Sequence, residues 1–255
     1  MLNKTTSPFF SIVIPTLNEE KYLPKLLKDI SNQTFDLNQI EIIHIDGHSD
    51  DETIKLAQGF TSKINLKSYV VKKRNVSYQR NFGAKKAIGK WIMFIDADTR
   101  IPNYFLDGIK YRLSQNPKVD IFTSYLKVGS KTALDKTLEA TLNLALEIYL
   151  MTNKVVAFGA FIGVKKAVIK RVQFDEKQKV LEDTIFVNAA IKLGFSFKIF
   201  HDPTYVYSLR RVKKEGALKM LKTEFFLQFK HVTAQSDFSK DDYGYVMLGG
   251  NYYNK

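Results

Sequence analysis

The sequence predicts an α/β fold in which a mostly parallel central sheet carries helices on both faces. Over residues 9–96, apolar runs of strand length alternate with segments of helical periodicity, which is typical of such folds. Parallel sheets covered on both faces have near-continuous apolar strands, and these runs have that character. Small polar and acidic residues directly follow several of the runs. Ligands bind beyond the carboxyl ends of such strands, so we expect the site there.

The first half of the chain contains regularly alternating predicted elements. The predicted strands are residues 9–15 (FFSIVIP), 40–46 (IEIIHID), 64–71 (INLKSYVV) and 90–96 (KWIMFID). The predicted helices are residues 19–30, 50–60 and 77–89. Asn18 is expected to cap the first helix, and Pro24 lies near its start, where a missing N–H is tolerated.

The second half is less regular. It predicts strands at residues 119–128, 155–166 and 195–200 and helices at 131–153, 181–194 and 215–232. Gly194 is expected to end the helix before the last strand.

Composition narrows the class of protein. The 255 residues are 45% hydrophobic and 25% charged, as in globular proteins, and contain no cysteine. A disulfide framework, a thiolate metal site and a cysteine nucleophile are therefore excluded. The N-terminus lacks the pattern of a signal peptide, and no apolar run reaches the ~18 residues of a membrane span. We expect a cytoplasmic protein.

The net charge of +13 favours an anionic partner. Residues 53–95 contain ten Lys or Arg and no Asp or Glu. Nucleic acid, a phosphorylated small molecule and an acidic membrane surface would each fit, and so would an ordinary solvated surface. A nucleic-acid-binding module is the alternative from a different class, but none of its common motifs is present. A dinucleotide-dependent oxidoreductase is excluded because no G-x-G-x-x-G follows the first strand.

Two carboxylates follow the most apolar run. Asp96 and Asp98 are separated only by Ala97, directly after the buried segment 91–95. Such a pair can share a divalent cation or divide its work between a cation and a hydroxyl. A lone D-x-D is often a solvated turn, but Asp46 ends a neighbouring strand and strengthens the case for a site.

Several motifs together resemble the family 2 glycosyltransferases of GT-A fold. They are SIVIPTLNEEKYLPKLL, IEIIHIDGHSDDET, RNFGAKKAIGKWIMFIDADT, GAFIGVKK and LEDTIFVNAAIKLGF, which occur in the family's order and spacing. The resemblance covers roughly residues 9–205. It implies a Rossmann-like, mostly parallel sheet and a hexosyltransferase-type enzyme that uses a nucleotide-diphosphate sugar.

The resemblance also implies roles in the donor half of the chain. Donor-binding residues would be Pro15, Thr16, Glu19, Asp46, Arg80, Asp96, Ala97, Arg210 and Arg211. Asp46 would accept a hydrogen bond from the base, Asp96 would hold the ribose, and Asp98 would bind Mn²⁺ or Mg²⁺. For Asp46 a turn cap remains the alternative, and for Arg80 a surface position on a basic helix.

In the acceptor half, the acidic pair Glu182 and Asp183 matches the family's catalytic position. Asp183 would act as general base in an inverting reaction. A retaining transferase on the same fold is the second enzymatic hypothesis, and helix-dipole compensation is the structural alternative for these acids. The GAFIG segment would form a wall for sugar and acceptor, with packing as its alternative. The motif departs from the family at His48, which replaces a glycine, although histidine tolerates a left-handed turn.

The C-terminal part predicts a helical extension, residues 206–255, after a transferase domain of residues 1–205 with a nucleotide-sugar-binding half (9–98) and an acceptor half (99–205). Its basic segment would bind the diphosphate through Arg210 and Arg211 or face an anionic membrane. An apolar stripe of Leu218, Leu221, Phe225, Phe229 and Val232 predicts a helix that packs on the domain or lies in a membrane interface. The expected acceptor is a carbohydrate or a lipid-linked sugar. A lipid-linked acceptor would place the enzyme at the inner face of the cell membrane. No nucleic acid is expected as a partner.

Overall fold

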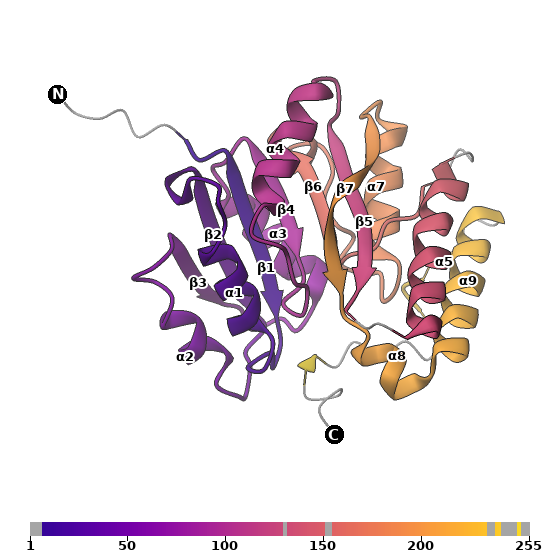
Figure 1. Ribbon diagram of the computed structural model, residues 1–255, viewed down its shortest axis with the longest axis horizontal. Coiled ribbons are helices and arrows are strands. Elements are labelled where there is room, and N and C mark those ends of the chain that lie inside the picture. Colours follow the sequence, from indigo (N-terminus) through magenta and orange to yellow (C-terminus); the bar gives the residue numbers. More distant parts are fainter. Residues whose placement is uncertain (1–6, 130–131, 151–154, 234–237, 241–248, 251–255) are drawn as a thin grey trace.

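A seven-stranded sheet in the order β3-β2-β1-β4-β6-β5-β7 forms the middle layer of this computed structural model (Figure 1). The structure describes residues 7–129, 132–150, 155–233, 238–240 and 249–250. The strands are β1 (Phe10–Thr16), β2 (Ile40–Asp46), β3 (Leu66–Val70), β4 (Trp91–Ile95), β5 (Ile121–Val128), β6 (Phe161–Lys165) and β7 (Phe197–Tyr207). The α-helices are α1 (Leu23–Ser31), α2 (Thr53–Gln58), α3 (Val76–Lys86), α4 (Phe105–Gln115), α5 (Ala133–Leu150), α6 (Lys166–Ile169), α7 (Glu182–Lys192), α8 (Arg210–Glu215) and α9 (Ala217–Thr233), and a 3₁₀ turn spans Leu37–Gln39.

The sheet is mostly parallel, as predicted. β1 pairs in parallel with β2 and β4, and β2 with β3. β6 runs antiparallel to both β4 and β5, whereas β5 and β7 are parallel. The predicted strand 155–166 is therefore shorter than expected and reversed in direction. The last strand extends past its predicted end at residue 200 to Tyr207, because residues 205–207 pair with residues 126–128 of β5.

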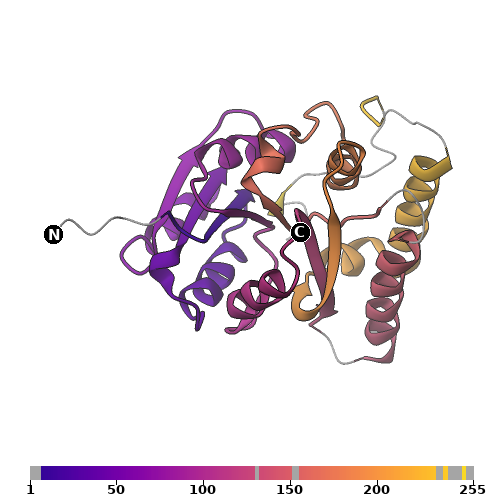
Figure 2. The ribbon, with the colours of Figure 1, turned by 90° about the horizontal axis from the view of Figure 1, so that it is seen from above.

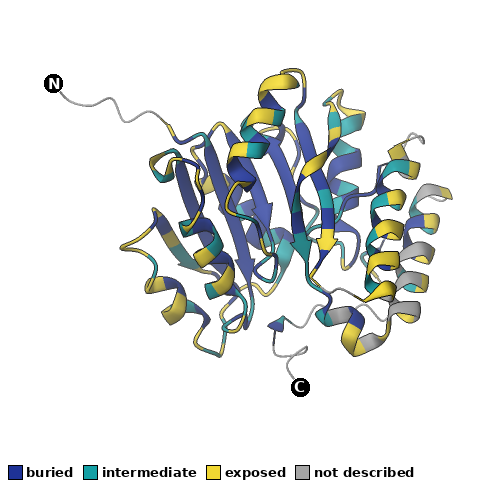
Figure 3. Ribbon diagram, in the orientation of Figure 1, coloured by how far each residue is buried: buried dark blue, intermediate teal, exposed yellow. Residues whose placement is uncertain are grey.

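Both faces of the sheet are buried, which explains the continuous apolar runs (Figure 3). Alternate residues of one strand enter two different cores. Ile12 and Ile14 of β1 pack in the core that includes α1 and α4. Val13, between them, packs in the core that includes α3 and α7. The helices that follow the strands thus cover opposite faces, as in other α/β folds.

Helix α4 was not predicted from the sequence, although Phe105, Leu106, Ile109 and Leu113 recur at helical spacing and are buried. One local expectation was wrong. Asn18 does not cap α1, because that helix begins at Leu23. Asn18 has a left-handed backbone, φ 56°, and its side chain accepts a hydrogen bond from Asp50 N at 2.7 Å. Pro24 does lie in the first turn of α1.

The C-terminal extension begins with the end of β7 and continues into the helices α8 and α9, and α9 lies beside α5 (Figures 1 and 2). Phe229 of the predicted apolar stripe is 55% exposed, so it does not pack on the domain, while Leu227 on another face is fully buried. Leu227 packs with Val180, Leu181 and Phe238, so α9 does pack on the domain. The side chains of Leu218, Leu221, Phe225 and Val232 lie outside the described residues. Of the helices described, none is both long enough and apolar enough to cross a membrane.

Candidate active site

A pocket of about 550 Å³ lies at the carboxyl ends of β1 and β4, where the alternating pattern predicts a site. Most of the predicted site residues line it: Pro15, Thr16, Glu19, Arg80, Asp96, Ala97, Asp98, Glu182, Asp183 and Arg210. Asp46 is not among the lining residues, and the side chain of Arg211 lies outside the described part of the chain. The fold therefore gathers acids and arginines from distant segments into one cavity.

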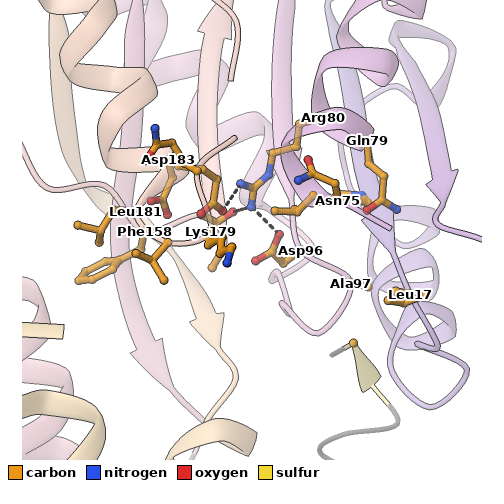
Figure 4. Close-up of a pocket in the computed structure, with 18 of the residues that line it drawn as sticks. Leu17, Asn75, Gln79, Arg80, Asp96, Ala97, Phe158, Lys179, Leu181 and Asp183 are labelled. Carbon is orange, nitrogen blue, oxygen red and sulfur yellow. Dashed lines mark hydrogen bonds and ion pairs between the residues drawn. The ribbon is translucent and has the colours of Figure 1, made fainter. Parts of the chain in front are cut away.

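Arg80 holds the two halves of the pocket together (Figure 4). Its side chain extends from α3 and is almost fully buried. Nη2 lies 3.0 Å from Asp96 Oδ1, and Nη1 lies 2.9 Å from Glu182 Oε1. Nη2 also donates to Gly159 O at 3.2 Å. Arg80 is thus not on the surface, and its guanidinium fixes the end of β4 against the start of α7.

Arg210 forms a second arginine centre on the other side of the pocket. It reaches from α8 and donates to both carboxylate oxygens of Glu19 at 2.7 Å. Its Nε lies 2.8 Å from Asp98 Oδ2, and its guanidinium lies over the ring of Tyr22. Desolvation raises the pKa of Glu19 to about 7 although Arg210 opposes the shift. Desolvation likewise raises the pKa of Asp96 to about 6, against the effect of Arg80.

Asp183 lines the pocket from the first turn of α7. Its Oδ1 accepts a hydrogen bond from Thr184 N at 2.7 Å. Gly159 is essential to this arrangement, since a Cβ there would lie 2.9 Å from Asp183 Oδ2 and 2.6 Å from Arg80 Nη2. At Gly163, a Cβ would instead overlap the ring of Phe122. Gly159 thus lies against two residues of the pocket and Gly163 against the core, while the role of the GAFIG segment as a wall for sugar and acceptor stays a prediction.

Asp46 has the environment of the turn cap that was the alternative for it. Its carboxylate is fully buried and accepts hydrogen bonds from Thr16 Oγ1 at 2.9 Å, Ser49 N at 2.7 Å and Ser49 Oγ at 2.6 Å. These bonds hold the turn after β2 and leave no face of the carboxylate open to a base. In the same turn His48 has φ 64°, so the left-handed conformation expected for it is confirmed.

Sequence reasoning missed several residues that shape the pocket. Gln79 donates to Thr16 O at 2.7 Å and Ile45 O at 2.9 Å, and so bridges the ends of β1 and β2. Gln79 precedes Arg80 in a predicted helix, but nothing in the sequence indicates that its side chain points inward. Leu181, before the acidic pair, has φ 58°, which is unusual for a bulky residue. Leu227 and Gly249 also line the pocket from the C-terminal part of the chain.

The acids suit a cation that is shared with a bound ligand. Within the described residues no group of three His, Asp or Glu side chains could hold a metal ion alone. Mg²⁺ sites commonly use one or two carboxylates and complete the shell with water and substrate phosphates. Asp98 and Asp96 provide such hard oxygen ligands, and both line the pocket. The pair of Asp98 with Arg210 would have to open for Oδ2 to reach a cation.

Comparison with known families decides the class. The profile of glycosyl transferase family 2 matches residues 11–173, which include β1, β4, Asp96 and Asp98. The chain belongs to glycosyl transferase family 2. The resemblance seen in the sequence motifs is thereby confirmed. Asp183, Arg210 and the C-terminal helices lie beyond the matched residues.

Characterised relatives in this family are substantially longer. The chain is 22% identical over 230 residues to the poly(ribitol-phosphate) beta-N-acetylglucosaminyltransferase TarS of Staphylococcus aureus, covering 88% of this chain and 40% of TarS. It is 25% identical over 228 residues to the minor teichoic acid biosynthesis protein GgaB of Bacillus subtilis, covering 86% of this chain and 25% of GgaB. This chain thus spans less than half the length of either relative.

Solved structures confirm the GT-A fold. A crystal structure of S. aureus TarS residues 1–349 with UDP-GlcNAc superposes with a TM-score of 0.63 at 22% identity, covering 78% of this chain and 58% of that one. The mannosyltransferase PcManGT of Pyrobaculum calidifontis, in complex with GDP-Man and Mn²⁺, superposes with a TM-score of 0.69 at 18% identity, covering 91% and 66%.

Proposed function

We propose that this chain transfers a sugar from a nucleotide-diphosphate donor to an acceptor hydroxyl with inversion at the anomeric carbon. The observation that carries the proposal is that one pocket contains both the Asp96 and Asp98 carboxylates and the Asp183 carboxylate. The first two suit a donor diphosphate with its cation, and the third suits a proton acceptor. Membership of family 2 supports the donor class.

On the donor side, the nucleotide would lie along the end of β1, against Pro15, Thr16 and Leu17. Asp96, held by Arg80, would contact the ribose. Arg210 can offer two parallel N–H donors to phosphate oxygens, the geometry that favours arginine at such sites. We propose no direct contact of Asp46 with the base, because its hydrogen bonds are internal. Its part would be to shape the loop around the base.

On the acceptor side, Asp183 would take the proton from the attacking hydroxyl as that oxygen bonds to the anomeric carbon. The bond from that carbon to the diphosphate oxygen breaks on the opposite face, and the diphosphate leaves with the electron pair. Glu182 was predicted as a catalytic partner, but it is buried and paired with Arg80. We therefore propose that Glu182 positions the pocket and that Asp183 alone exchanges the proton.

Asp98 would hold the divalent cation, which when bound supplies electrostatic stabilisation to the leaving diphosphate. The complex of PcManGT with GDP-Man and Mn²⁺ supports this expectation. Either Mn²⁺ or Mg²⁺ would suit these oxygen ligands.

For substrates, we propose UDP-GlcNAc as donor and a polyol-phosphate polymer as acceptor. The name of TarS gives the sugar and the polymer, and a TarS crystal structure contains UDP-GlcNAc. The pocket rim supports an anionic acceptor, because Arg74, Lys177 and Lys179 line it and all are exposed. The net charge of +13 would also attract a polyanion.

The exposed side of α9 is a separate surface, for which we propose contact with an anionic membrane. Lys219, Lys222, Phe226 and Phe229 recur at helical spacing and are exposed. A face of lysines and aromatic residues suits a headgroup layer of anionic lipid. This face shares Phe229 with the predicted stripe and adds Phe226, which is also exposed.

A donor and acceptor screen tests the proposed function. Purified chain is incubated with UDP-GlcNAc or GDP-Man, with and without Mn²⁺ or Mg²⁺, and with poly(ribitol phosphate) or a neutral glucan. We expect cation-dependent transfer of GlcNAc to the polyanion, and loss of that transfer in Asp98→Asn. Asp107→Asn, an exposed acid on α4, is the matched control and should behave as wild type. Transfer that is unaffected by chelation and by Asp98→Asn would reject the cation site. Absence of transfer and hydrolysis with every donor would reject the function.

A further inference from the structure

The contact between Arg210 and Asp98 affects how a divalent cation and a nucleotide diphosphate would bind together. Arg210 belongs to α8, beyond the residues that match the family profile. Its Nε lies 2.8 Å from Asp98 Oδ2, while its two Nη atoms donate to the carboxylate oxygens of Glu19 at 2.7 Å. The acid proposed to bind the cation therefore already has a cationic partner in the protein itself.

The pocket requires such a partner because its wall is acidic. Glu19, Asp96 and Asp98 all line it, and Glu19 is buried. Unpaired carboxylates at these positions would repel one another in a region of low dielectric. Arg80 neutralises Asp96 and Glu182, and Arg210 neutralises Asp98 and Glu19. These two arginines come from distant segments of the chain, α3 and α8.

The two arginines differ in exposure. Each contacts three acceptor atoms, but Arg80 is only 2% exposed and lies within the wall of the pocket. The Arg210 side chain is 16% exposed and belongs to the first residue of a short helix, α8. Its guanidinium also lies 4.8 Å from the centroid of the Tyr22 ring.

We propose that Arg210 is the resident counter-ion of Asp98 and is exchanged for the divalent cation when a nucleotide diphosphate binds. The inference rests on the proposed function. A cation alone would free the guanidinium from Asp98 and leave part of its hydrogen-bonding capacity unmet inside the pocket, which is unfavourable. A diphosphate offers new acceptor oxygens to the released group. Binding of the cation and binding of the nucleotide therefore strengthen each other, and this positive coupling depends on Arg210.

Mn²⁺ binding to the purified full chain, measured by EPR of the free ion with and without UDP, tests this coupling. We expect weak binding to the wild type without UDP and binding stronger by about tenfold or more with UDP, within the usual range of coupling between sites. Arg210→Gln should bind Mn²⁺ about tenfold more tightly without UDP and lose most of the coupling. Arg210→Lys, which keeps the charge, should bind no more tightly than wild type. Arg100→Gln, which breaks an exposed pair with Asp29, is the control and should match wild type.

Unchanged Mn²⁺ affinity in Arg210→Gln without UDP would overturn the proposal. If that variant does not fold, Glu19→Gln provides the opposite test: Arg210 loses its competing carboxylate and holds Asp98 more firmly, so Mn²⁺ should bind more weakly. Equal or tighter binding would overturn the proposal. Failure here is distinct from failure of the proposed function, because cation-dependent turnover of the sugar nucleotide by wild type would still stand.

Discussion

At the scale of single residues, the pocket is organised by charge pairs between distant parts of the chain. Arg80 and Glu182 are paired across 102 positions, and Glu19 and Arg210 across 191. Both pairs lie largely out of solvent, so removing one partner would strand a buried charge. Asp183 has different contacts: its Oδ1 accepts a hydrogen bond from Thr184 N, and its Oδ2 faces Gly159.

This difference predicts the behaviour of Asp183→Asn. The variant keeps size and shape but cannot accept the proton, so kcat should fall by at least ~10²-fold, a typical contribution of a general base. Nucleotide affinity, measured by calorimetry with UDP, should be unchanged because the donor residues remain in place. NMR of the wild-type product gives an independent check. Retention of the donor's anomeric configuration would contradict the role of Asp183 and favour a retaining mechanism.

At the scale of elements, the start of α7 depends on the C-terminal helix. Leu181, the residue just before α7, has φ 58°, a conformation that costs a bulky residue roughly 1–2 kcal/mol. The cluster of Val180, Leu181, Leu227 and Phe238 holds it there. Gln228 also donates to Thr184 Oγ1 at 3.4 Å. The direction of Glu182 and Asp183 is therefore set in part by α9.

Leu227→Ala should consequently affect turnover more than donor binding. Truncation of this buried side chain should destabilise the protein by about 2–5 kcal/mol. In the folded population, kcat should fall while the affinity for UDP stays near that of wild type, because Leu181 loses its support. Phe226→Ala, at an exposed neighbour on the same helix, is the control. Thermal denaturation and steady-state kinetics at a temperature where both variants are folded provide the measurement. A loss of stability with unchanged kcat would limit Leu227 to packing.

The strands β1, β2 and β3 are linked by a buried histidine. His44 Nε2 lies 2.8 Å from Thr16 Oγ1, and Nδ1 lies 3.0 Å from Ser68 Oγ. Burial lowers the pKa of His44 to about 4, against the opposing charge of Asp46. The imidazole ring of His44 is therefore neutral in the folded sheet.

This pKa predicts a loss of stability in acid. The unfolded chain takes up the proton near the usual pKa of 6.5 and the folded one only near 4, so stability is full above 6.5 and declines as the pH falls toward 4. The change should be on the order of 3 kcal/mol. Urea denaturation of wild type and His44→Gln across this range should show a smaller decline in the variant. Parallel pH profiles would contradict the assignment, and His201→Gln, which removes an exposed histidine, is the control.

At the scale of the whole molecule, the C-terminal extension is part of the pocket as well as an addition to it. Arg210, Leu227 and Gly249 all line the cavity. Gly250 N donates to Leu17 O at 2.9 Å, and a Cβ at Gly250 would overlap the carbonyl oxygen of Asn18. A division into residues 1–205 and 206–255 therefore describes chain order, while the contacts join the two segments.

The outer face of α9 predicts binding to anionic vesicles. Full-length protein should sediment with phosphatidylglycerol-containing liposomes at low salt and remain in the supernatant with neutral ones, because lysine attraction is screened and lipid-dependent. Phe226→Ser with Phe229→Ser should reduce binding by removing the apolar part of the face. Tyr104→Ser with Tyr111→Ser, at exposed aromatic residues just before and within α4, should leave it unchanged. Recovery of the wild type in the supernatant with anionic vesicles would exclude the membrane as the partner of α9.

The sequence alone determined the family, the α/β class and the edge of the sheet that carries the site. These follow from local information: apolar runs, helical spacing and acids at strand ends, such as Asp96 and Asp98 after β4. The helix α4 was also within reach of that reasoning, since its buried residues are regularly spaced.

Only the tertiary structure decided the partners of those residues. The inward direction of Arg80, the internal bonds of Asp46, the contact of Arg210 with Asp98 and the reversal of β6 each depend on segments far apart in the chain. The buried side of α9 likewise depends on the surface it meets, because both Leu227 and Phe229 are apolar enough to pack. Spacing along a chain records which side chains share a face. Pairing of buried charges and choice of packing face are settled by burial and distance, which exist only after the chain has folded.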